Sequence, residues 1–224
     1  MKRDNKRQYQ PSPLISKFVK YIPKGRVLDL GCGRGNNSLF LASKGFLVTA
    51  VDKNNNQIEK IKRLAKSQNI SIKAKHKDIR DFSFRKNYYS AIIATNSLFF
   101  LSKKEFDSII KKMKTAVKEN GLIIISSFTT KDEMFKKMSR SKQFIKTSER
   151  TFRDKKGNKW YFLKPKELIK HFDKENFEKI FYREEIIEDR GHQGYPEPHK
   201  HAIARIVVKR APLLSPHLIS RAFK

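Results

Sequence analysis

The chain of 224 residues contains one cysteine and no long apolar run. Cys32 has no partner for an intramolecular disulfide, which is typical of a protein from a reducing compartment. No apolar stretch approaches the roughly 20 residues that cross a bilayer, and no apolar segment follows the basic residues at the start, so no membrane span and no secretory signal are expected. We therefore expect a soluble, cytoplasmic protein without a membrane partner.

Acidic residues are also scarce, with 22 Asp and Glu against 51 Lys and Arg, which gives a formal net charge of +29. The excess is spread along the whole chain, and much of it lies on polar faces of amphipathic segments such as 58–64. This spread favours a Lys-rich solvated surface over a dedicated nucleic-acid surface. Because such a field still attracts polyanions and anionic small molecules, RNA stays an alternative partner to a small-molecule acceptor.

The apolar content is sufficient for one domain with a substantial core, since 38% of the residues are hydrophobic and 11% are aromatic. From residue 26 onward, short apolar segments alternate with amphipathic segments of helical period. This alternation predicts parallel βαβ units with right-handed crossovers, and hence a doubly wound α/β sheet. The expected strands are 27–30, 46–51, 70–74, 89–95 and 122–127, followed by 177–188 and 201–209, which pair antiparallel.

The chain divides into three expected segments. Residues 1–24 form a basic leader and a helix, residues 25–210 form the α/β domain, and residues 211–224 form a tail that could dock as a helix. Within the domain, the connection 128–163 is long and rich in aromatic residues, which favours an ordered, lid-like insertion. A hairpin that turns at residues 154–158 is expected inside it.

A glycine-rich loop, Gly31-Cys32-Gly33-Arg34-Gly35, separates the first expected strand from the next helix. Ligands bind at this edge of a parallel sheet, and glycines there allow unusual backbone angles and close approach. Asp29, two residues before the loop, would repel a phosphate but attract an ammonium group. Asn36 stands where a dinucleotide fingerprint requires its third glycine, which disfavours a nicotinamide cofactor.

Two further acids follow the next two strands. Asp52 ends the second strand, where a carboxylate can accept hydrogen bonds from both hydroxyls of a ribose. Asp78 and Ile79 follow the third strand and offer an acid and an apolar surface to an adenine ring. A ligand with an ammonium, a ribose and an adenine but no pyrophosphate is S-adenosylmethionine, which we predict as the cofactor. The predicted cofactor-binding residues are Asp29, Gly31, Cys32, Gly33, Gly35, Asn37, Asp52, Lys53, Asp78, Ile79, Thr95 and Asn96.

The segment 27–39, with 48–52 after it, resembles class I S-adenosylmethionine-dependent methyltransferases. More narrowly, the chain is similar to the tellurite-resistance (TehB-like) methyltransferase family in the stretch 37–39, in 92–101 and in the histidine-containing segment 189–205. The resemblance covers about residues 20–210. It implies a Rossmann-like, seven-stranded methyltransferase sheet, mostly parallel with an antiparallel C-terminal strand pair, and a class I methyltransferase domain over residues 25–210. The connection after residue 128 is longer than compact members require.

The resemblance implies methyl transfer, an in-line displacement in which the enzyme aligns the nucleophile and excludes water. A chalcogen oxyanion or a thiolate attacks through a lone pair and needs no strong base, whereas an amine or hydroxyl needs help. We expect a methyltransferase that acts on a small molecule, such as a chalcogen or metalloid oxyanion or a thiol-like nucleophile. An RNA methyltransferase is the alternative. A non-catalytic S-adenosylmethionine-binding module is disfavoured by the intact set of acids and glycines.

Histidines gather near the end of the chain, where His192, His199 and His201 fall within ten residues. Their alternative roles are substrate orientation or anion binding, a structural loop, and metal binding. Their spacing matches no familiar zinc pattern and cysteine ligands are missing, so no metal site is expected. Arg205 follows at strand spacing and, with Arg190, could hold an oxyanion through charge-assisted hydrogen bonds. The predicted catalytic residues are His192, His199 and Arg205.

Overall fold

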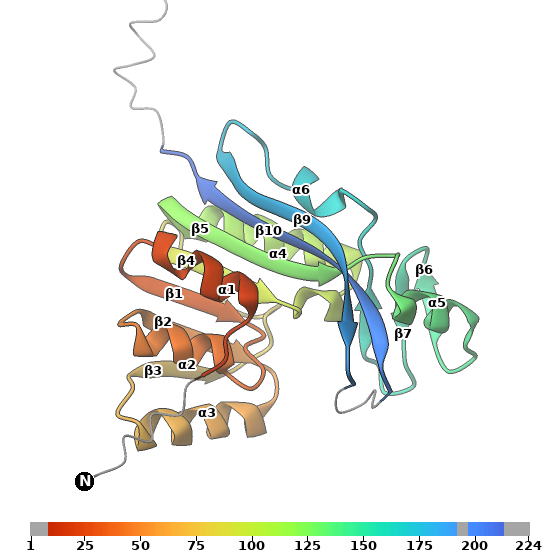
Figure 1. Ribbon diagram of the computed structural model, residues 1–224, viewed down its shortest axis with the longest axis horizontal. Helices are drawn as coiled ribbons and strands as arrows, with labels where there is room; N and C mark the ends of the chain where they lie inside the picture. The colour runs from red at the N-terminus through yellow and green to blue at the C-terminus, as the bar shows by residue number, and fades with distance from the viewer. Residues whose placement is uncertain (1–8, 192–196, 213–224) are drawn as a thin grey trace, which may run out of the picture.

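The computed structural model describes residues 9–191 and 197–212. The predictions that concern residues 1–8 of the leader, His192 and the tail beyond residue 212 therefore lie outside the described residues. The described part contains a seven-stranded sheet with helices on both faces and, beside it, a small three-stranded sheet (Figure 1). In these described ranges, no helix is both long and apolar enough to cross a membrane.

The large sheet is built from strands that alternate with helices along the first half of the chain. Its strands are β1 (Arg26–Leu30), β2 (Leu47–Asp52), β3 (Ile72–His76), β4 (Tyr89–Thr95), β5 (Val117–Phe128), β9 (Phe177–Asp189) and β10 (His199–Arg210). The small sheet contains β6 (Ile145–Ser148), β7 (Thr151–Arg153) and β8 (Lys159–Tyr161). The helices are α1 (Pro13–Phe18), α2 (Asn36–Ser43), α3 (Asn55–Ser67), α4 (Lys103–Ala116), α5 (Glu133–Arg140) and α6 (Glu167–Lys170), with single 3₁₀ turns η1 (Val19–Tyr21) and η2 (Leu98–Phe100).

The strand order of the large sheet is β3-β2-β1-β4-β5-β10-β9. The first five strands in this order pair parallel, and β10 runs antiparallel to both β5 and β9. The predicted Rossmann-like sheet, mostly parallel with an antiparallel C-terminal strand pair, is confirmed. The order reverses between β1 and β4, and the crevice beyond the carboxyl ends of such strands is where open α/β sheets bind ligands.

Both faces of the sheet are covered by helices. On one face, α1 and α2 pack residues such as Ile15 and Leu41 against Val27 and Ile93. On the other face, α4 packs Phe106 and its apolar neighbours against the inner strands. Strands covered on both faces read as continuous apolar runs, which is why β4 and β5 were recognisable in the sequence.

Six of the seven predicted strands differ from their predicted bounds, most of them by one or two residues, and β4 agrees. β5 begins at Val117 rather than at residue 122, because the chain passes from α4 directly into a strand whose register shifts against β4. Asn120 adopts a positive φ of 59° inside this strand. β3 spans Ile72–His76 rather than residues 70–74.

The long connection after β5 carries the small sheet. The predicted hairpin is confirmed as β7 and β8, and β6, which was not predicted, pairs antiparallel with β7. Aromatic side chains hold this sheet against the end of β5 and η2, where the Trp160 ring stacks on Phe99 with 5.5 Å between the ring centroids. The connection is therefore ordered, and β8 lies against the crevice at the switch point.

Candidate functional site

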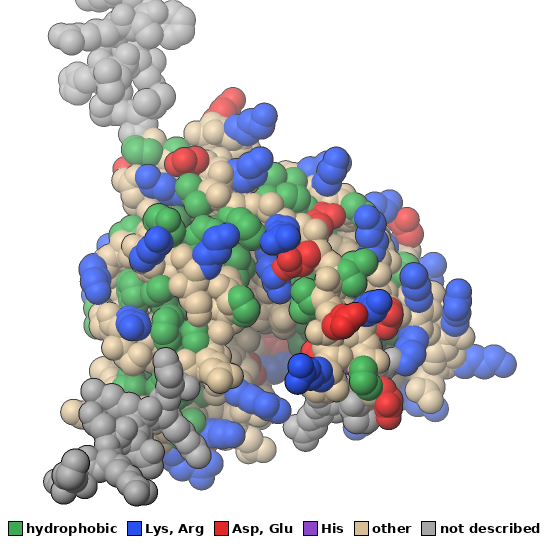
Figure 2. All heavy atoms as spheres, viewed as in Figure 1, with side chains coloured by type: hydrophobic (Ala, Val, Ile, Leu, Met, Phe, Trp, Pro, Cys, Tyr) green, Lys and Arg blue, Asp and Glu red, His purple; other side chains and the backbone are tan. Residues whose placement is uncertain are grey.

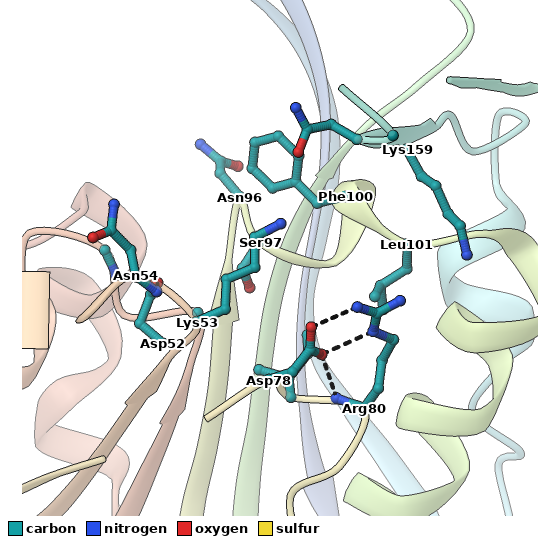
Figure 3. A pocket seen from close by; sticks show the side chains of 15 residues that line it. Asp52, Lys53, Asn54, Asp78, Arg80, Asn96, Ser97, Phe100, Leu101 and Lys159 are labelled. Atoms are coloured by element: carbon teal, nitrogen blue, oxygen red, sulfur yellow. Dashed lines mark hydrogen bonds and ion pairs between the residues drawn. The ribbon is translucent and has the colours of Figure 1, made fainter. Parts of the chain in front are cut away.

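A cavity of about 340 Å³ opens at the carboxyl edge of the parallel strands. Four loops that follow β1, β2, β3 and β4 line it, and the β7–β8 turn and β8 close one side. Figure 3 shows Asp52 and Lys53 on one side of the cavity and Arg80, Leu101 and Lys159 on the other. The lining residues are Gly31, Gly33, Asp52, Lys53, Asn54, Asp78, Ile79, Arg80, Asn96, Ser97, Phe100, Leu101, Gly157, Asn158 and Lys159.

The glycine loop forms the floor of the cavity because it presents backbone rather than side chains. Gly31 has a φ of +68°, and a Cβ atom at this residue would lie 2.4 Å from the Cβ of Ser97. The hydroxyl of Ser97 donates a 2.6 Å hydrogen bond to the Leu30 carbonyl, which holds the loop after β4 against the glycine turn. Only glycine fits this approach of two loops.

Asp52 joins the glycine loop to the end of β2. Its Oδ2 accepts a 2.8 Å hydrogen bond from the Gly33 amide, and its Oδ1 accepts one of the same length from the Asn54 amide. Each carboxylate oxygen can accept a second hydrogen bond, and the residue lines the cavity. The Asp52 carboxylate is thus held in one orientation, is partly exposed, and lies beside the backbone of the glycine loop.

Asp78 is held on the opposite side of the cavity by Arg80. The guanidinium binds both carboxylate oxygens, at 2.9 and 2.6 Å, as Figure 3 shows. These hydrogen bonds lower the pKa of Asp78 below its usual value. Arg80 also contacts Glu105, and the ammonium of Lys159 lies 2.8 Å from the same carboxylate. The carboxylates of Asp78 and Glu105 and the cations of Arg80 and Lys159 thus form one network. This network connects the loop after β3 to α4 and β8.

Asp29 does not line the cavity. Its side chain is 1% exposed, and its Oδ2 accepts a 2.5 Å hydrogen bond from the Ser38 hydroxyl at the start of α2. Burial, with a smaller contribution from the charge of Asp52, raises its pKa to about 7 against the opposing effect of the Ser38 hydrogen bond. The carboxyl group thus connects the end of β1 to the start of α2, the two elements that the glycine loop joins.

Four other predicted cofactor residues lie in the layer behind the cavity. Gly35 packs against Ile61 and Leu39 of the neighbouring helices. The Asn37 amide donates to Thr95 Oγ1 at 2.8 Å and its oxygen accepts from the backbone before α1, so it braces β4. The Cys32 thiol packs beside the α2–α3 cluster. Burial and the charges of Asp29 and Asp52 raise its pKa, so the thiol stays protonated.

Asn96 lines the cavity with a left-handed backbone, at a φ of +51°. Its backbone amide donates to the Ser126 carbonyl at 3.0 Å, and its side-chain oxygen accepts from the Ser126 hydroxyl at 2.7 Å. The end of β4 is thus fixed to the end of β5.

Two of the predicted catalytic residues, His199 and Arg205, lie on β10 together with His201, and the third, His192, lies outside the described residues. His199 and His201 are buried, at 8% and 4% exposure, and their Nε2 atoms are 2.9 Å apart. Arg205 lies further along the strand, where its guanidinium forms an ion pair with Glu185 of β9. None of the three lines the cavity described above.

Several cavity residues were missed by the sequence analysis. Arg80, Phe100, Leu101 and Lys159 come from three separate segments, which are the loop after β3, the segment after β4 and β8, and no local spacing brings them together. Their place in the chain could have indicated two of them. Phe100 and Leu101 follow β4 at the switch point, where open α/β sheets bind ligands.

The family model of the tellurite resistance protein TehB matches residues 6–181. This match covers more than half of the chain, so the chain belongs to the TehB family. A protein of Haemophilus influenzae named "Probable S-adenosyl-L-methionine-dependent methyltransferase TehB" is 36% identical over 115 residues. Those residues are 51% of this chain and 40% of the relative, so the chain matches less than half of that protein.

Solved structures share the fold. The crystal structure of TehB from Haemophilus influenzae superposes with a TM-score of 0.67 at 24% identity, over 88% of this chain and 61% of that one. A structure described as a SAM-dependent methyltransferase from Methanosarcina mazei gives the same TM-score at 21% identity, over 88% of this chain and 98% of that one. The seven-stranded sheet is therefore the methyltransferase type of Rossmann-like fold.

Proposed function

We propose that this chain is an S-adenosylmethionine-dependent methyltransferase that methylates a small, anionic or thiol-like molecule. One observation carries the proposal. The backbone of Gly31 and Gly33 and the carboxylate of Asp52 line a single cavity at the switch point of the sheet. Membership of the TehB family supports it.

The residues present fit this cofactor. Gly31 and Gly33 leave backbone open to a ligand, and Asp52 offers unused acceptor positions to a pair of ribose hydroxyls. Ile79 and Leu101 supply apolar surface beside Asp78, which suits a heteroaromatic ring with an exocyclic amine. A volume of about 340 Å³ lies within the range of small-molecule sites.

When bound, S-adenosylmethionine supplies a methyl group on a sulfonium, with a good leaving group already in place. The chain's own residues then have to position the acceptor and exclude water. Phe100 and the β7–β8 turn border the cavity and would shield it from solvent. The net charge of +29 attracts anionic acceptors.

We do not propose RNA as the methyl acceptor, and the labelling experiment below includes it as an alternative. Figure 2 shows Lys and Arg side chains spread over the visible face and interrupted by acidic and hydrophobic ones. A dedicated RNA surface would gather them along one groove.

The acceptor can be identified with S-adenosylmethionine labelled in its methyl group. Selenite, tellurite, low-molecular-weight thiols and total RNA are offered separately, and the label is counted in each product. We expect incorporation into an oxyanion or thiol and none into RNA above a heat-denatured control. Label found only in RNA would refute the small-molecule acceptor, and no incorporation into any class would count against the proposed activity.

A further inference from the structure

The start of β10 brings together a cluster of titratable side chains outside the cofactor cavity, and three of the four are buried. His199 and His201 lie two positions apart on β10, and Asp189 at the end of β9 is paired with His199 in the sheet. Asp132, the N-cap residue of α5, lies against the same strand. One ligand atom from each of Asp189, His199 and His201 lies within 4.8 Å of the others.

The Nδ1 atoms of both imidazoles face groups that accept hydrogen bonds. Nδ1 of His199 lies 2.8 Å from the carbonyl oxygen of Glu197, which can only accept. Nδ1 of His201 lies 3.0 Å from Oδ2 of Asp132. That carboxylate is fully buried and also accepts hydrogen bonds from the amides of Met134 and Ala202. Nδ1 of each imidazole thus faces an acceptor, and Nε2 of each ring faces the other ring.

Two ring nitrogens therefore meet at the start of β10. The two Nε2 atoms are 2.9 Å apart, with the rings nearly perpendicular at 87°. The ring of His201 is held in place by stacking on Phe128, with 4.5 Å between the ring centroids. Two ring nitrogens this close suit a single cation held between them, either a shared proton or a metal ion.

The surroundings favour a metal ion as that cation. Asp189 adds a carboxylate oxygen to the two nitrogens, and a proton shared by two imidazoles needs no third donor. Orientation of a ligating histidine by a carboxylate or a backbone carbonyl on its other nitrogen is the usual outer arrangement of a metal site.

We propose that Asp189, His199 and His201 bind one divalent transition-metal ion, with Zn²⁺ as the best match. Two imidazole nitrogens and one carboxylate suit Zn²⁺, and three protein ligands leave a coordination position for an exogenous ligand. No metal was predicted here, because the spacing of His192, His199 and His201 matches no familiar zinc pattern and cysteine ligands are missing. Antiparallel pairing of β9 with β10, rather than a local motif, brings the three donors together.

The site lies one aromatic layer away from the cofactor cavity. Phe128 stacks on His201 and packs on Phe99, whose neighbour Phe100 lines the cavity. The open coordination position would take an anionic oxygen or sulfur ligand. That this coordination position binds the methyl acceptor rests on the proposed function. That the site binds a metal ion does not.

Calorimetry with Zn²⁺ tests the site on the full chain without a histidine tag. We expect one equivalent to bind to the native protein, and Asp189→Asn and His199→Ala to weaken binding at least about tenfold, since even outer partners of a metal ligand are worth 10–100-fold. His76→Ala, which removes an exposed imidazole elsewhere, is the matched control and should bind like the native chain. Co²⁺ bound in place of Zn²⁺ should give visible absorption bands that Asp189→Asn abolishes.

Two outcomes would overturn the proposal. One is the absence of stoichiometric Zn²⁺ binding by the native chain. The other is equal binding by Asp189→Asn, His199→Ala and the native chain, which would leave a proton shared between the imidazoles. Affinity for S-adenosylmethionine, measured on the same samples, shows that each variant is folded and separates failure of the metal site from failure of the proposed function.

Discussion

At the scale of single residues, Asp29 differs most from its expected role. A carboxylate two residues before the glycine loop was predicted to attract the ammonium of the cofactor, yet the side chain is buried and bonded to Ser38. Sequence position could show that this acid lies at the carboxyl end of β1. It could not show whether the carboxyl group binds the ligand or another residue of the fold. The residue that it binds, Ser38, lies on α2, and this contact is set by how α2 packs on β1.

The raised pKa of Asp29 predicts a specific dependence of stability on pH. The carboxyl group has a pKa of about 7 in the folded chain and an ordinary value of 3.8 when unfolded. Its contribution to the free energy of unfolding is therefore complete below pH 4 and is lost as the pH rises towards 7. An asparagine does not titrate. The free energy of unfolding of Asp29→Asn, taken relative to that of the native chain, should therefore rise by about 2–4 kcal/mol between pH 4.5 and pH 8.

Urea unfolding at both pH values measures this difference. Asp81→Asn, which changes an exposed acid, is the control. A difference between Asp29→Asn and the native chain that does not change with pH would show that Asp29 titrates normally.

Gly31 predicts a second effect at this scale. Gly31→Ala places a Cβ atom 2.4 Å from Ser97 at a positive φ, whereas Gly45→Ala has a positive φ but no atom within 4 Å of the added Cβ. Gly45→Ala should cost about 1–2 kcal/mol of unfolding free energy, and Gly31→Ala about 1–3 kcal/mol more. Denaturant unfolding of the pair separates backbone strain from collision. Equal losses would mean that the two loops do not meet as described.

At the scale of elements, Glu105 connects three segments. It completes the capping box of α4 with Ser102, and its carboxylate also binds Arg80 of the loop after β3 and Lys159 of β8. Burial opposes ionisation of Glu105, but hydrogen bonds from Lys159, Ser102 and Arg80 outweigh it and lower the pKa to about 2. The small sheet is thereby tied to the cavity by charge as well as by aromatic packing.

Glu105→Gln should loosen this connection without removing the helix cap, because glutamine also serves in a capping box. Loss of two partly exposed ion pairs is worth about 1 kcal/mol in total. Amide hydrogen exchange in β8 should then be about fivefold faster. Glu59→Gln, in an exposed ion pair on α3, should leave β8 unchanged. Unaltered exchange in Glu105→Gln would mean that aromatic packing alone holds the small sheet.

At the scale of the whole molecule, the sequence was sufficient for the sheet and for part of the site. Alternating apolar and amphipathic segments predict parallel strands, and parallel strands bring their carboxyl ends to one edge, so Asp52 and Asp78 could be placed together in advance. Contacts between distant segments could not be predicted. Lys159 reaches Glu105 across 54 positions, and Asp132 reaches His201 across 69, and such pairs leave no periodic pattern in the sequence.

The central claim is that the cavity between the glycine loop and Asp52 binds S-adenosylmethionine, and calorimetry on native and Asp52→Ala chains tests it most directly. Each hydrogen bond to a charged group is worth about 1.5–3 kcal/mol, so we expect one site in the native chain and at least about tenfold weaker binding in the variant. Glu59→Ala, on an exposed face of α3, should bind like the native chain, and thermal melts should show all three folded. No binding by the native chain, or undiminished affinity in folded Asp52→Ala, would contradict the account.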